Sequence, residues 1–107
     1  MDNDILCFKT KKGAYFLNRS EIVLCEAEGR YTKIKTVSKT ILVSKNLKLV
    51  EKIIADNNFY RIHHCYLINI KFVTEYSSST NTLILNNCNI KIAVRKRKDF
   101  FTKLMKQ

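Results

Sequence analysis

The chain has 107 residues, and Lys plus Arg outnumber Asp plus Glu by 20 to 9, which gives a formal net charge of +11. Hydrophobic residues make up 46% and charged residues 27%, which excludes a disordered polyelectrolyte and predicts one globular domain over residues 1–107. The excess positive charge favours a polyanionic partner: nucleic acid first, then an anionic membrane surface, with an inert basic surface as the remaining alternative.

The cysteines and the N-terminus indicate the cellular compartment. No two cysteines have CxxC spacing, and the chain opens with acidic residues rather than an apolar signal segment. No uncharged apolar run approaches the ~20 residues that a membrane span needs. We therefore expect a cytoplasmic protein whose cysteines are reduced and buried as small hydrophobic side chains: Cys7, Cys25, Cys65 and Cys88.

The first half of the chain consists of short alternating runs separated by polar turns, which is typical of an antiparallel β domain. Gly13 permits a hairpin turn and Gly29 a sharp turn, because glycine adopts positive φ at little steric cost. The expected strands are Ile5–Phe8, Ala14–Leu17, Ile22–Glu28, Tyr31–Val37 and Thr40–Val43.

A helix over about residues 45–56 follows, because apolar residues recur there at helical spacing and Ser44 can act as the N-cap. In the second half, Asn86 and Asn87 suit a primed hairpin turn because Asn tolerates left-handed backbone angles. The strands expected there are Phe72–Tyr76, Thr82–Leu85 and Ile90–Val94, and a short amphipathic helix closes the chain.

Two polar segments do not fit a purely structural role. Phe59–Asn69 places Arg, two His, Cys, Tyr and Asn among large apolar residues, which indicates a segment that crosses the core and surfaces beside a functional face. Arg95–Lys98 is a run of four cations at the expected start of the closing helix. Cations at a helix N-terminus oppose the macrodipole, so this run favours contact with nucleic acid over a merely solvated surface.

Several separated motifs occur in a particular order: Glu-Ala-Glu-Gly-Arg-Tyr-Thr after the third strand, Ser-Lys-Asn-Leu-Lys at the helix, the 59–69 segment, and Val-Arg-Lys-Arg-Lys. In this order the chain resembles the LytTR-type DNA-binding domain of bacterial transcriptional regulators, from about Ile5 to Leu104. The resemblance implies a mainly β fold of about ten short, mostly antiparallel strands in small sheets, with one or two short helices.

The resemblance also implies a function. Loops rather than a recognition helix are expected to enter successive major grooves of double-stranded DNA and to bend it, with sequence specificity. The chain would be the output domain of a response regulator or a stand-alone regulator, binding paired repeats, with a homodimer possible on DNA. No catalytic activity, cofactor, metal, small-molecule substrate or membrane is implied.

Candidate DNA contacts carry over from the resemblance by position. The base-edge candidates are Arg30, His64 and Arg95, since Arg donates a bidentate pair to guanine and His donates or accepts according to its tautomer. The phosphate candidates, which would position the domain without reading sequence, are Lys33, Lys45, Lys96 and Lys98.

Three positions depart from the family pattern. His64 stands where a basic residue or Asn is common, and Cys65 and Val94 each stand where Ser is common. The two missing hydroxyls could have touched phosphates, so these changes bear on base preference rather than on the mode of binding.

Other polar residues have structural roles that compete with DNA contact. His63 is expected to be a hydrogen-bonded packing residue and Asn69 a backbone cap. Arg61 either contacts a phosphate or pairs with an acid such as Glu26 or Glu28. The tyrosines expected at the edge of the core rather than as stacking platforms are Tyr31 and Tyr66.

Competing functions have weaker support. A zinc site from His63, His64, Cys65 and Cys88 lacks paired ligands on both sides, and a Cys65–His nucleophile lacks an oxyanion-stabilising loop. RNA or single-stranded DNA would require exposed aromatic residues on a sheet face, whereas the candidates are scattered rather than clustered: Tyr15, Phe16, Tyr60 and Tyr76. A basic protein- or anionic-membrane-interaction module is the alternative from another class, supported by the amphipathic segment Lys98–Lys106.

Overall fold

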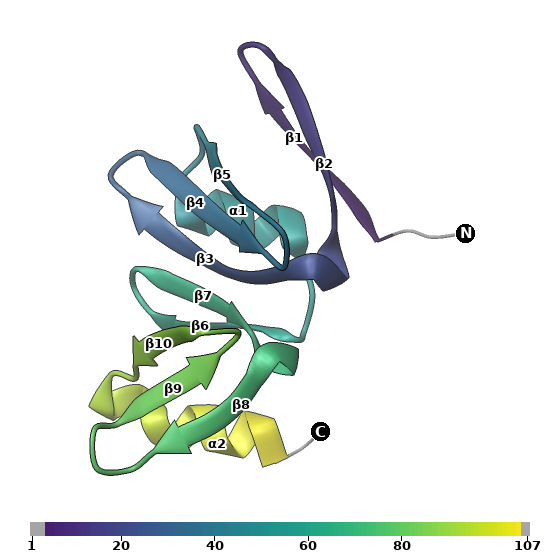
Figure 1. Ribbon diagram of the computed structural model, residues 1–107. Helices are drawn as coiled ribbons and strands as arrows, with labels where there is room; N and C mark the ends of the chain where they lie inside the picture. The colour runs from purple at the N-terminus through teal and green to yellow at the C-terminus, as the bar shows by residue number, and fades with distance from the viewer. Residues whose placement is uncertain (1–3, 106–107) are drawn as a thin grey trace.

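The structure, a computed structural model, describes residues 4–105 and shows ten short strands in three antiparallel sheets with two α-helices (Figure 1). The mainly β prediction is confirmed. The central sheet has the order β5 (Thr40–Val43), β4 (Tyr31–Thr36), β3 (Ile22–Glu28), β7 (Tyr66–Asn69) and β6 (Phe59–His63). The flanking sheets are β1 (Ile5–Thr10) with β2 (Gly13–Asn18), and β10 (Cys88–Lys91), β9 (Thr82–Leu85) and β8 (Val73–Ser77).

The central sheet separates two hydrophobic cores. Its middle strands carry apolar residues on both faces: Cys25 and Leu67 point into one core, and their neighbours Leu24 and Ile68 point into the other. A strand buried on both faces reads as a continuous apolar run, which is the pattern seen at the start of β3.

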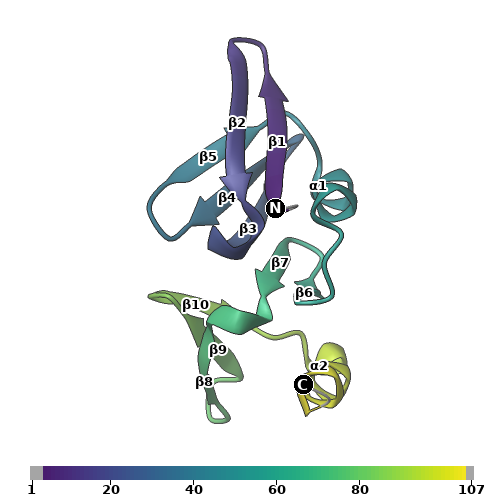
Figure 2. The same cartoon turned by 90° about the vertical axis from the view of Figure 1, so that its right-hand side faces the viewer.

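The first core lies between the central sheet, the β1–β2 hairpin and helix α1 (Leu47–Ile54). Phe8 and Leu17 on the inner side of the hairpin are almost completely buried, and the hairpin projects past the rest of the molecule (Figure 2). Helix α1 buries Val50 and Ile54 against the same core.

The second core lies between the central sheet, the three-stranded sheet and helix α2 (Arg97–Met105). Phe100 of α2 is completely buried, and its ring lies 5.5 Å from that of Tyr60 on β6. Both helices therefore lie on the same side of the molecule with β6 between them (Figure 2). Lys106 of the expected amphipathic segment lies outside the described residues.

The predicted N-cap of α1 is wrong. Asn46, not Ser44, precedes the first helical residue, and its side chain accepts the Leu49 N–H at 2.9 Å. The Thr32 hydroxyl donates to the Lys45 carbonyl at 2.7 Å, which ties the segment before the helix to β4. The helix therefore begins at Leu47, where the apolar spacing starts, and not at about residue 45 as a Ser44 cap implied.

The β9–β10 hairpin confirms the Asn-Asn turn, since Asn86 and Asn87 have φ of 45° and 68°. The strand expected to continue to Val94 instead ends at Lys91. Asn81 accounts for this, because its side chain donates to the Ile92 carbonyl at 2.7 Å and its own carbonyl accepts the Ile92 N–H. Val94 then opens a 3₁₀ turn, η3 (Val94–Lys96), and is exposed.

The cysteines do not all behave as expected. Cys25 is completely buried, Cys65 and Cys88 are partly buried, and Cys7 is exposed on the outer face of the β1–β2 hairpin. The prediction of four buried cysteines is therefore correct only for Cys25. Among residues 4–105 no helix is long and apolar enough to cross a membrane.

Candidate nucleic-acid interface

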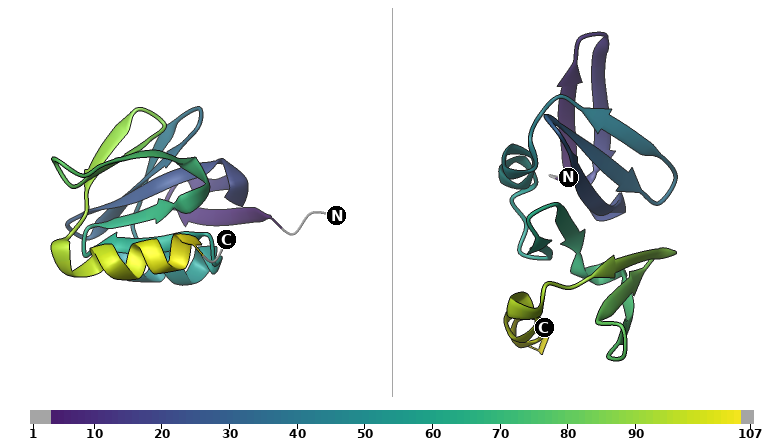
Figure 3. Two further views of the ribbon diagram at one scale, coloured as in Figure 1. Left: turned by 90° about the horizontal axis from the view of Figure 1, so that it is seen from below. Right: turned by 90° about the vertical axis from the view of Figure 1, so that its left-hand side faces the viewer.

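Three connections open on the same side of the molecule, on the left in Figure 1 and facing the viewer in the right panel of Figure 3. They are the β3–β4 turn at Gly29 and Arg30, the β6–β7 turn at His64 and Cys65, and η3 with Arg95. The three turns that carry the predicted base-edge residues thus lie on one side, although they are far apart in sequence.

The β3–β4 turn presents Arg30 to solvent. Gly29 has φ of 61°, a left-handed conformation that costs other residues energy, and this allows the tight reversal. Arg30 is exposed and makes no hydrogen bond or ion pair with any residue in the part of the chain described. Its guanidinium is therefore free to bind a base edge or a phosphate.

The β6–β7 turn presents His64. The rings of His63 and His64 are stacked with centroids 4.4 Å apart, and His63 Nδ1 accepts the Cys65 N–H at 3.1 Å. His63 is thus a hydrogen-bonded packing residue, as predicted, while His64 is exposed.

His64 and Arg95 border the same hollow. A cavity of about 340 Å³ is lined by His63, His64 and residues 93–96. Two of the three base-edge candidates therefore lie close enough to act on one stretch of ligand, whereas Arg30 lies outside this hollow.

The phosphate candidates have different surroundings. Lys98 is exposed in the first turn of α2, and Lys45 is partly buried before α1. Lys33 Nζ lies 2.9 Å from Glu28 Oε2, and this hydrogen bond and charge pair raise the pKa of Lys33. Lys96 Nζ donates to the Arg61 carbonyl at 3.2 Å and lies over the Tyr60 ring.

Arg61 has an acidic partner, but not one of those predicted. Its Nη1 lies 3.1 Å from Glu51 Oε1, on the outer side of α1, rather than near Glu26 or Glu28. Its Nη2 donates to the His64 carbonyl at 2.8 Å. Glu51 could not be identified as this partner from the sequence, because its only signal was an outward position on the expected helix.

The remaining structural predictions have mixed outcomes. Asn69 is a backbone cap, since its side chain accepts from Lys71 N and donates to the Ile22 carbonyl. Tyr66 is partly buried with its hydroxyl 3.3 Å from Glu26, and burial and that carboxylate raise its pKa. Tyr31 is 46% exposed, so the prediction of a core-edge residue is wrong there.

The structure brings His63, His64 and Cys65 together, with one possible metal-ligand atom of each within 4.8 Å of the others. Cys88, the fourth residue of the predicted zinc set, is not in this group and instead accepts from Lys35 Nζ at 3.7 Å. The Cys65 amide already occupies His63 Nδ1, and Arg95 and Lys96 line the same hollow as the histidines. A cation would therefore meet local positive charge, so this arrangement suits an anionic ligand better.

Comparison with known proteins identifies the class. Residues 12–105 match a family model described as the LytTr DNA-binding domain. The mainly β fold and this match define a DNA-binding domain. The chain belongs to the LytTR family, which implies DNA binding in transcription regulation.

Individual relatives agree with this class. The chain is 26% identical over 78 residues to the transcriptional regulatory protein NatR and 24% identical over 85 residues to the sensory transduction protein LytT, both from Bacillus subtilis. These matches cover 73% and 77% of this chain but only 34% and 35% of the relatives, so the chain spans about a third of their length.

A solved structure shares the fold. It is described as the LytTr DNA-binding domain of a methyl-accepting/DNA response regulator from Bacillus cereus, and it matches with a TM-score of 0.76 at 19% identity. The match covers 95% of this chain and 97% of the other.

Proposed function

We propose that this protein binds double-stranded DNA sequence-specifically, with its three clustered turns entering major grooves. The observation that carries the proposal is that the β3–β4 turn, the β6–β7 turn and η3 lie on one side of the molecule (Figure 3). Each of them carries an exposed base-edge candidate: Arg30, His64 and Arg95 respectively. Arg can donate two hydrogen bonds to guanine, and His can bond a base edge. Loops held by sheets would thus replace a recognition helix.

Phosphate contacts would supply much of the affinity. Lys98 and Lys45 are the candidates without a competing side-chain partner among residues 4–105, whereas Lys33 and Lys96 are engaged within the protein. With a net charge of +11, the domain would attract any DNA and then select a site by its three turns.

The whole chain would act as one such domain in the cytoplasm, as a regulator or as the output part of a longer one. Two copies would occupy paired repeats, with a homodimer formed on DNA. We assign it no enzymatic activity, cofactor, metal or small-molecule substrate, because the functional side chains are suited to recognition of DNA.

The membrane-interaction alternative loses its main support. The apolar side of α2 packs into the second core, where Phe100 is completely buried and Phe101 packs edge-on against Tyr76. That side of the helix is therefore not available to insert into lipid. Binding of single strands is also disfavoured, because Tyr60 and Tyr76 are buried or partly buried and Tyr15 and Phe16 point to opposite faces of their hairpin.

The test is fluorescence anisotropy with three probes: a duplex enriched by repeated selection, a mixed-sequence duplex and a matched single strand. We expect the selected duplex to bind far more tightly than the other two at physiological salt. Equal, salt-sensitive binding to all three would refute sequence-specific recognition and leave a generic polyanion binder. Co-sedimentation with anionic vesicles, without DNA preference, would support the interaction-module alternative.

A further inference from the structure

The Arg61 side chain is hydrogen-bonded to the backbone of the β6–β7 turn. Its Nη2 donates to the carbonyl of His64 at 2.8 Å. The guanidinium therefore restrains the backbone of the residue that we propose to contact a base edge. Its Nε is buried without a hydrogen-bond partner among residues 4–105. The side chain thus packs against the turn, with 29% of its surface exposed.

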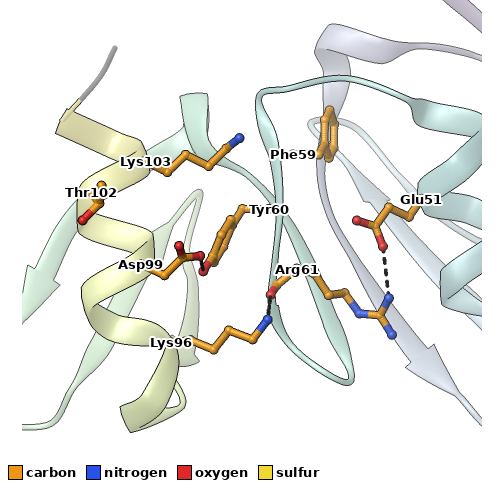
Figure 4. A pocket seen from close by; sticks show the side chains of 8 residues that line it. All are labelled: Glu51, Phe59, Tyr60, Arg61, Lys96, Asp99, Thr102 and Lys103. Atoms are coloured by element: carbon orange, nitrogen blue, oxygen red, sulfur yellow. Dashed lines mark hydrogen bonds and ion pairs between the residues drawn. The ribbon is translucent and has the colours of Figure 1, made fainter.

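Glu51 fixes the orientation of Arg61. Its Oε1 lies 3.1 Å from Arg61 Nη1, and Figure 4 shows the two side chains bridging from α1 to β6. Helix α1 is anchored in the first core by Val50, the residue before Glu51. The position of His64 is therefore tied, through Arg61, to a helix on another part of the fold.

Lys96 makes a second connection, from the adjacent turn. Its Nζ donates to the Arg61 carbonyl at 3.2 Å and lies 5.8 Å from the centre of the Tyr60 ring. The Tyr60 hydroxyl in turn donates to Asp99 Oδ2 at 2.6 Å, in the first turns of α2 (Figure 4). A hydrogen bond and a cation–π contact thus connect strand β6 to η3, next to His64 and Arg95 in the sequence.

We propose that Glu51, Arg61 and Lys96 are positioning residues that hold His64 and Arg95 in the mutual geometry required for base reading. They line a hollow of about 540 Å³ between α1, β6 and α2, and Lys96 also lines the neighbouring hollow that His64 and Arg95 share. Recognition groups must be held within tight tolerances by supporting contacts, and this network supplies them. The inference rests on the proposed function and deepens it by naming what sets specificity.

The direction in which Glu51→Ala changes the affinity for DNA distinguishes a positioning role from an effect of net charge. Glu51→Ala raises the net positive charge by one, so electrostatics alone predicts tighter binding to every DNA. If Glu51 positions the turn, affinity for the selected duplex instead falls by about three- to tenfold, because half-exposed ion pairs and charged hydrogen bonds have this magnitude. Affinity for the mixed duplex should stay equal or rise.

Glu21→Ala is the matched control. Glu21 is an exposed acid in the turn between β2 and β3, on the side of the molecule away from the three turns (Figure 1). The substitution makes the same charge change without touching the network. It should tighten binding to both duplexes slightly. Tighter or unchanged binding of the selected duplex by Glu51→Ala would overturn the proposal.

Lys96→Met gives a second, independent readout. A phosphate contact that is lost reduces the slope of log affinity against log salt by about 1 and weakens all sequences equally. Loss of a positioning residue instead weakens binding to the selected duplex. It leaves the slope of log affinity against log salt on mixed DNA nearly unchanged. A fall of about 1 in the slope on both duplexes would assign Lys96 to a phosphate and overturn its positioning role.

Failure of the two proposals can be distinguished. If the unaltered protein does not prefer the selected duplex, the proposed function itself fails. If it does, and Arg95→Ala abolishes the preference while Glu51→Ala and Lys96→Met retain it, only the positioning role fails. Urea midpoints of each variant within the range of Glu21→Ala exclude misfolding. Arg61→Lys keeps the positive charge but loses the guanidinium that contacts both Glu51 and the His64 carbonyl. Its affinity for the selected duplex should therefore fall as in Glu51→Ala.

Discussion

Arg95 differs from Arg61 in how its guanidinium is used. Arg61 is held by Glu51 and by the His64 carbonyl, whereas Arg95 is exposed on η3 and makes no hydrogen bond or ion pair within residues 4–105. A side chain without such contacts adds little to the free energy of unfolding, so its removal should leave the fold intact. Arg95 is therefore the best residue with which to test base reading.

Arg95→Ala should cost roughly 1–3 kcal/mol of binding free energy on the selected duplex and relax the sequence preference, because one bidentate base contact is lost. Competition anisotropy against single-base variants of the site measures both effects. Lys98→Ala is the control and should weaken selected and mixed DNA alike. Equal losses on both duplexes for Arg95→Ala would mean that Arg95 contacts only phosphate.

Buried acidic groups make the fold sensitive to alkali. Burial raises the pKa of the Cys25 thiol from 9.0 to about 12, and burial together with the Asp99 hydrogen bond raises the pKa of the Tyr60 hydroxyl from 10.0. The folded state thus retains protons that the unfolded chain releases above its own pKa values. Stability is fully present below about pH 9 and falls as pH rises toward the folded values.

Urea unfolding followed from pH 7 to pH 11 should therefore show a constant midpoint at first and a falling one above about pH 9. The decline should be shallower in Tyr60→Phe, which has no hydroxyl to ionise. A midpoint that stays level through pH 11 in the unaltered protein would contradict this prediction.

At the scale of elements, α1 supports the β6–β7 turn through Glu51, so its stability bears on the interface. The helix has only eight residues, which is too short to be stable alone, and it depends on its cap and its packed face. Asn46 caps its N-terminus, and Ala55 ends it in a left-handed conformation with φ of 45°.

Asn46→Ala should lower the free energy of unfolding by about 1 kcal/mol, because the Leu49 N–H loses its acceptor. Differential scanning calorimetry should show a Tm lower by about 4–8 °C. Ser44→Ala is a matched control two residues earlier, where an exposed side chain makes no cap and little change is expected. Equal effects of the two substitutions would argue against the capping role of Asn46.

For the whole molecule, the dominant quantity is the net charge of +11 on a body with axes of 44 × 34 × 23 Å. Each phosphate that the protein neutralises should contribute about 0.9 to the slope of log affinity against log salt on duplex DNA. Anisotropy between 50 and 300 mM salt should therefore give a steep negative slope for selected and mixed duplexes alike. A slope near zero would exclude phosphate neutralisation as the source of affinity.

Much of this protein could be predicted from its sequence. Alternation and turn residues placed most strands, and the Asn86–Asn87 turn was correct, because β-turn chemistry is local. The basic composition and the order of motifs indicated the LytTR family, and its model matches residues 12–105. The DNA contacts named from the family's pattern stay predictions, although the three turns that carry Arg30, His64 and Arg95 lie on one side.

The tertiary structure decided what depends on residues distant in sequence. The true cap of α1 depends on where packing starts the helix, and the end of β10 depends on Asn81, eleven residues from its partner Ile92. Glu51 as the partner of Arg61, and Lys96 turned inward to the Arg61 carbonyl, could not be predicted either. The local sequence pattern predicts which side chains are polar. Only the packing of α1 and α2 against β6 determines which of these side chains contact one another.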